Sequence, residues 1–201
     1  MRVAYALLGV VWCIVIVVVL WSVNHTFTKG EHSKTDTRTT VPTSMAMQLS
    51  ITSPVFQVEG VIPQRYTCDG EAVSPPLTIS GVSEAVKTLV LIVEDRDVPK
   101  ALKPDGIYDH WILFNIPAMT TDIAEGASAG ISGKNSAGEN GYAAPCPPKE
   151  YEPSEHRYFF RLYALDTELL LSDGASRQDV EAAMAGHVLQ EALVIGRYAR
   201  K

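Results

Sequence analysis

Three runs of aliphatic and aromatic residues constrain the fold of this chain most strongly. They are 86–93 (VKTLVLIV), 110–116 (HWILFNI) and 158–165 (YFFRLYAL). Their β-branched and aromatic content is typical of strands, and the nearly continuous first run predicts a central strand that is buried on both faces. Because no convincing helix separates the runs, we expect antiparallel sheets rather than a parallel α/β fold.

Shorter segments complete a mostly β prediction with one C-terminal helix. Ser176 is a typical N-cap, with Asp179 at the third helical position. Apolar residues at Val180, Met184 and Val188 then follow a helical spacing, which places His187 on the helix. The shorter strands are expected at 48–52, 55–58, 77–80 and 193–198.

The N-terminal apolar run predicts a membrane anchor. Residues 3–23 carry no charge, and a helix of this length spans about 30 Å, the thickness of a bilayer core. The polar, threonine-rich stretch after it is typical of a tether. We therefore expect a transmembrane signal anchor over 1–23, a flexible tether over 24–46 and a globular domain over 47–201.

The membrane orientation has evidence on both sides. The very short N-terminal tail favours a signal anchor that exports the domain, whereas Lys29, Lys34 and Arg38 favour a cytoplasmic domain. The resulting expectation is a single-pass membrane protein with an extracytoplasmic domain.

The charge balance argues against a nucleic-acid partner. The chain has 17 Lys and Arg residues against 23 Asp and Glu residues, a formal charge of −6. Residues 47–201 alone carry −8, and they contain no basic cluster of the density that nucleic-acid binding needs.

Ionisable residues gather at the ends of the three strong runs. Asp95 and Asp97 follow the first run, His110 opens the second, and His156 and Tyr158 open the third. In antiparallel neighbours these ends converge, which predicts a pocket. The aspartates could instead be turn residues, and two carboxylates with two imidazoles could bind a metal, although their spacing matches no fixed metal motif.

Six short motifs follow one another along the globular domain: YTCDG (66–70), SPPL (74–77), EDRDVP (94–99), DHW (109–111), PCPP (145–148) and HRY (156–158). In this order they resemble the phosphatidylethanolamine-binding protein family, in its bacterial and archaeal Raf-kinase-inhibitor-like branch. The resemblance implies a Greek-key β-sandwich with a C-terminal helix. It also implies a non-catalytic module without a cofactor, whose small anion pocket takes phosphate or a phosphorylated headgroup, and which can inhibit a kinase or a protease.

By motif matching, the pocket positions of the family are Asp95, Asp97, His110, Pro147, His156 and Tyr158. Bare carboxylates repel phosphate, so we expect an aspartate to bond one nitrogen of His110 or His156 and to favour its imidazolium form. Arg157 alternates with the histidine along the strand and is expected to point away from the pocket. Cys68 and Cys146 lie in family-like motifs near the pocket and form a possible disulfide if the domain is exported.

Hydrolysis is the alternative from another class. Residues 126–130 (GASAG) match the G-x-S-x-G pattern around a nucleophilic serine, Ser128, and Asp166 and His187 follow in the order of such enzymes. That pattern needs a strand before it and a helix after it, and the surrounding sequence predicts neither.

Overall fold

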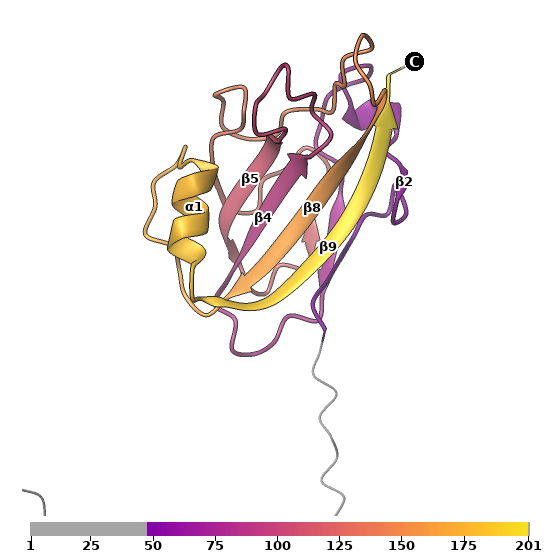
Figure 1. Cartoon of the computed structure of the whole chain (residues 1–201). Coiled ribbons are helices and arrows are strands. Elements are labelled where there is room, and N and C mark those ends of the chain that lie inside the picture. Colours follow the sequence, from indigo (N-terminus) through magenta and orange to yellow (C-terminus); the bar gives the residue numbers. More distant parts are fainter. Residues whose placement is uncertain (1–47, 201) are drawn as a thin grey trace, which may run out of the picture. The chain divides into compact units, whose positions relative to one another are not determined.

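A computed structural model describes residues 48–200, which lie within one folded unit, Ser44–Lys201. The strands form two sheets, and one α-helix lies among the described residues (Figure 1). The elements in chain order are β1 (Ser50–Thr52), β2 (Gly60–Val61), the 3-10 helix η1 (Gln64–Tyr66), β3 (Leu77–Ser80), β4 (Thr88–Asp95), β5 (Tyr108–Pro117), β6 (Asp122–Ile123), β7 (Ile131–Ser132), β8 (Glu155–Leu165), α1 (Arg177–Met184) and β9 (Val188–Ala199).

The large sheet has the strand order β2-β9-β8-β4-β5-β7. The three strong apolar runs became its central strands β4, β5 and β8, and both β5 and β8 pair with β4 in antiparallel register. Every residue of β4 is buried, which confirms the prediction of a strand covered on both faces. The short edge strand β2 departs from the antiparallel expectation, because it pairs parallel to β9.

The small sheet has the order β1-β3-β6. The chain runs from β3 into the β4–β5 pair of the large sheet and returns to β6, which lies beside β3. The chain therefore passes from the small sheet to the large sheet and back within four consecutive strands. Residues 55–58 were predicted as a strand but form bends and turns, although Phe56 is buried in the core.

Two apolar clusters cover the two faces of the large sheet. One includes Leu77 and Ile79 of the small sheet together with Leu91 and Phe160 of the large one, so it fills the space between the sheets. The other packs Val180 and Met184 of α1 against the opposite face, at Ile92 and elsewhere. The prediction of a mostly β fold with one C-terminal helix is therefore confirmed.

The helix begins as predicted and ends earlier. The Ser176 hydroxyl accepts from the Asp179 backbone N–H, and the Asp179 carboxylate accepts from the Ser176 backbone N–H, which completes a capping box. Gly186 adopts a φ of 84°, a left-handed value that stops the helix, and β9 begins at Val188. His187 therefore lies in the turn between α1 and β9, not on the helix.

The prediction of a transmembrane helix needs correction. Within residues 48–200, no helix is long and apolar enough to cross a membrane, and α1, with eight residues, extends only about 12 Å. The predicted anchor over 1–23 and the whole predicted tether over 24–46 lie outside the described residues, as residue 47 does. The structure therefore gives no support to the signal anchor, the membrane contact or the single-pass extracytoplasmic location.

Candidate functional site

The antiparallel pairing brings the ends of three strands to one edge of the large sheet. Asp95, the last residue of β4, is opposite Tyr108 of β5 on one side and opposite Tyr158 of β8 on the other. His110 and His156 lie within two residues of these partners. The convergence expected from the sequence is therefore present.

Asp95 and His156 form a buried pair in this region. Nδ1 of His156 lies 2.6 Å from Oδ2 of Asp95, and the two side chains are 1% and 5% exposed. Burial acts to lower the pKa of His156, but the hydrogen bond and the charge of Asp95 outweigh it, so that this pKa is raised. The imidazolium form of His156 is thus favoured, as expected for an aspartate that supports a histidine.

The other ring nitrogen of His156 is the distinctive atom of the site. Nε2 is buried and has no hydrogen-bond partner among the described residues. Buried polar atoms are nearly always hydrogen-bonded, so an isolated one needs a reason. A donor held in place by a carboxylate on its far side is suited to an acceptor atom from a ligand.

Asp97 has a different role from Asp95. Its carboxylate accepts from Nε and Nη2 of Arg157, at 2.9 and 2.7 Å, and also from the Arg157 backbone N–H. Its own backbone N–H donates to Asp95 Oδ1 at 2.8 Å. Arg157 points outward as predicted, with half of its side chain exposed. Asp95 therefore pairs with the buried His156, whereas Asp97 pairs with the exposed Arg157.

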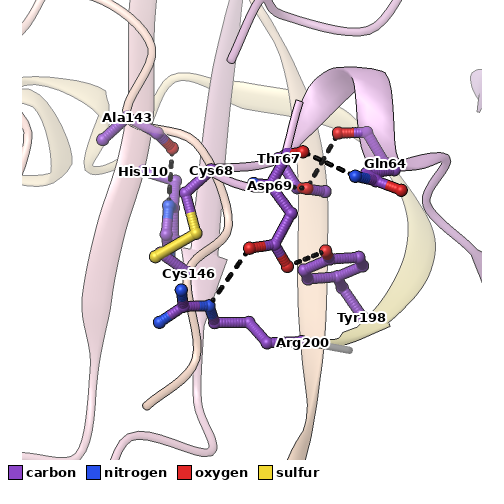
Figure 2. The surroundings of a disulfide bond; sticks show 9 residues. All are labelled: Gln64, Thr67, Cys68, Asp69, His110, Ala143, Cys146, Tyr198 and Arg200. Carbon is purple, nitrogen blue, oxygen red and sulfur yellow. Dashed lines mark hydrogen bonds and ion pairs between the residues drawn. A yellow bond between two sulfur atoms is a disulfide. The ribbon is translucent and has the colours of Figure 1, made fainter. Parts of the chain in front are cut away.

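His110 is held as a neutral ring. Its Nδ1 donates to the backbone oxygen of Ala143 at 2.6 Å (Figure 2). Burial lowers the pKa of His110 despite the raising effects of Ala143 and Asp95. The edge-to-face contact with Tyr158, at 5.1 Å between ring centroids, fixes the ring further. His110 can thus offer an unprotonated nitrogen where His156 offers a proton.

A cavity of ≈ 500 Å³ lies at this edge. Four of the six predicted site residues line it: Asp95, His110, Pro147 and His156. Asp97 and Tyr158 do not line it, because Asp97 faces Arg157 and the fully buried Tyr158 lies behind His110. The remaining lining residues are Val98, Leu102, Lys103, Tyr108, Ser136, Ala144, Cys146 and Pro148.

Three of the eight additional lining residues come from the segment between β4 and β5. Val98, Leu102 and Lys103 reach the cavity because Gly106, at a φ of 71°, helps to turn the chain back into β5. No motif marks these positions in the sequence. Cys146 and Pro148 lie in the PCPP motif. Tyr108 could also have been detected, because it lies two residues before His110 and therefore on the same face of the strand.

A disulfide closes one side of the site (Figure 2). Cys68 and Cys146 are joined, with Cα atoms 5.4 Å apart, a common separation for disulfides. This is the pair that the sequence marked as possible. Cys146 lies between Pro145 and Pro147, so the bond ties the proline-rich wall of the cavity to the loop after η1.

A buried charge network supports the site from the α1 side. The fully buried Glu94 accepts from Arg161 at 2.7 Å and from Arg96 at 2.6 Å, and it also pairs with Arg177. Arg177 further contacts Asp109 at 2.7 Å. Glu94 and Asp109 directly precede Asp95 and His110, so the network fixes the backbone that carries both pocket residues.

The hydrolase constellation is not assembled. Ser128 lies in an exposed loop between β6 and β7 and donates to the Gly130 backbone oxygen at 3.3 Å. The hollow beside Ser128 is lined by neither Asp166 nor His187, which contact each other at 2.8 Å. Across residues 48–200, no group of three or more His, Cys, Asp or Glu side chains is placed to hold a metal ion.

The fold and site define a two-sheet β protein whose cavity lies at the joined ends of three strands, with a histidine–aspartate pair in its wall. The phosphatidylethanolamine-binding protein family model matches residues 52–199, and the chain belongs to this family.

Relatives and solved structures agree with this assignment. A UPF0098 protein of Methanothermobacter thermautotrophicus is 45% identical over 159 residues, covering 76% of this chain and 99% of the relative. The structure of a putative phosphatidylethanolamine-binding protein homologue of Chlamydia trachomatis matches with a TM-score of 0.73 at 40% identity, covering 77% and 99% of the two chains. That of Escherichia coli YbcL, described as a new member of the mammalian PEBP family, matches with a TM-score of 0.68 at 26% identity, with the same coverage.

Proposed function

We propose that the cavity binds a small phosphate ester and that the protein acts as a binding module rather than an enzyme. The observation that carries the proposal is the buried Nε2 of His156, which lacks a protein partner while Asp95 holds Nδ1. An imidazolium N–H is a strong donor to a phosphate oxygen. Membership in a family described as phosphatidylethanolamine-binding supports the same chemistry.

The two histidines differ in charge. His156 donates to an anionic oxygen of the phosphate, whereas His110 is neutral and adds no second positive charge to the cavity. The Asp95 carboxylate is already paired with His156, so its charge repels the ligand less than a free carboxylate would.

The rest of the cavity favours an ester over free phosphate. At ≈ 500 Å³ it lies in the range of sites for organic ligands and exceeds what one phosphate group fills. Val98, Leu102, Pro147 and Pro148 give it apolar walls. We therefore place the phosphate at His156 and an organic group against these walls.

Calorimetric titration of the full chain with phenyl phosphate tests this function, with phosphoethanolamine and inorganic phosphate as further probes. The proposal expects binding of phenyl phosphate and a loss of roughly tenfold or more in the His156→Gln variant, since a hydrogen bond to a charged group contributes about 1.5–3 kcal/mol. His187→Gln is the matched control, because His187 also pairs with an aspartate but does not line the cavity. Equal affinities of wild type and His156→Gln would contradict the proposal.

A further inference from the structure

The wall of the cavity around Cys146 is poor in backbone donors. Pro145, Pro147 and Pro148 have no N–H and cannot donate a backbone hydrogen bond. Cys68 makes two bonds to this wall. Its backbone N–H donates to the Pro145 backbone oxygen at 3.0 Å, and its sulfur forms the disulfide with Cys146.

The loop on the other side of the disulfide is firmly held (Figure 2). The Asp69 carboxylate accepts from the Tyr198 hydroxyl and from Nε of Arg200, both near the end of the long strand β9. Thr67 donates its hydroxyl to the Gln64 oxygen at 2.9 Å. Gly70 packs so closely that a Cβ atom there would lie 2.2 Å from the same oxygen. The disulfide therefore joins a firmly anchored loop to a wall that is poor in backbone donors of its own.

Both cysteines are exposed, and Cys146 itself lines the cavity. We propose that the Cys68–Cys146 disulfide controls retention of the ligand: the oxidised form holds the proline wall against the ligand, and reduction releases the wall. This inference rests on the proposed function, because it concerns the same cavity.

A dithiol serves as the electron donor for this reduction. One thiolate of the donor attacks Cys68 or Cys146 and breaks the protein disulfide, giving a mixed disulfide. The second thiol of the donor then displaces the protein sulfur. Two electrons and two protons pass to the protein, so that Cys68 and Cys146 become thiols and the donor becomes a disulfide.

The experiment compares the affinity for phenyl phosphate of the full chain before and after reduction with dithiothreitol, with thiol titration to verify each state. We expect the reduced chain to bind roughly tenfold more weakly. In the oxidised chain the wall is already ordered, whereas in the reduced chain it must become ordered on binding, which costs free energy. The Cys68→Ser/Cys146→Ser double variant should show the affinity of the reduced chain and no response to dithiothreitol.

Three results would overturn the inference. Equal affinity of oxidised and reduced chains would overturn it and leave the proposed function intact. Absence of binding by the oxidised chain would overturn both. Loss of the near-ultraviolet circular dichroism on reduction would show that the disulfide maintains the whole fold, not the cavity wall.

Discussion

Oδ2 of Asp95 lies 2.6 Å from Nδ1 of His156, and both side chains are almost completely buried. The pair joins the last residue of β4 to the second residue of β8, so its geometry is set by the antiparallel register of two central strands. The carboxylate offsets the cost of burying a charged imidazole, which leaves Nε2 available as a donor.

The Asp95→Asn variant should lower the pKa of His156. Without the carboxylate, burial acts on the imidazolium with less compensation, so the ring becomes neutral at a lower pH. Titration of the His156 ring by NMR measures this pKa directly. Asp97→Asn is the control. Asp97 raises the pKa of His156 by its charge alone, without a hydrogen bond to the ring, so its removal should lower this pKa less than Asp95→Asn does.

Leu102→Ala should discriminate between ligands. Leu102 lines the cavity and is 51% exposed, so an organic group can cover it on binding. We expect the affinity for phenyl phosphate to fall about fivefold, in proportion to the lost apolar contact, and the affinity for inorganic phosphate to stay unchanged. Leu170→Ala, at a 96% exposed position away from the cavity, should alter neither. An equal loss for both probes would place Leu102 outside the organic subsite.

Glu94→Gln should destabilise the fold by about 3 kcal/mol, measured by urea unfolding. The substitution leaves the guanidinium groups of Arg161 and Arg177 beside a neutral amide, and breaking a buried ion pair is costly. Glu181→Gln removes an exposed partner of the same Arg177 and should cost less than about 1 kcal/mol. Similar losses in the two variants would show that the buried network contributes little.

The same carboxylate should contribute to acid unfolding. Burial acts to raise the pKa of Glu94, but hydrogen bonds from Arg96 and Arg161 and the charge of Arg177 lower it overall. A lowered folded pKa stabilises the fold above the unfolded value, about 4.3, and this contribution is lost as the pH falls through the folded pKa. Unfolding free energies of wild type and Glu94→Gln should therefore converge towards low pH. A constant difference down to about pH 2 would contradict this assignment.

The sequence predicted the fold where local pattern and packing agree. The continuous apolar run at 86–93 made β4, and Ser176 with Asp179 marked the start of α1. The end of α1 was misplaced because the apolar spacing continues through Val188. There, Gly186 and pairing with β8 decide the structure instead.

Part of the cavity lining could be predicted from motifs, and an aspartate–histidine pair was expected without its exact partners. Motifs identified Asp95, His110, Pro147 and His156, all of which line the cavity. Which aspartate contacts which partner depends on the turn after β4, where Asp95 accepts from the Asp97 backbone and directs the second carboxylate to Arg157. Lining residues such as Leu102 come from a loop whose path no local pattern specifies.

The most direct test of the account is the affinity of the full chain for phenyl phosphate as a function of pH. Above about pH 7 a phosphate monoester is already a dianion, since its second pKa is about 6, so further titration reports on the protein. The raised pKa of His156 predicts binding that is strong near pH 7 and weakens as the pH rises through the pKa of His156. Affinity that stays constant or increases as the pH is raised would contradict the assignment of His156 as the phosphate donor.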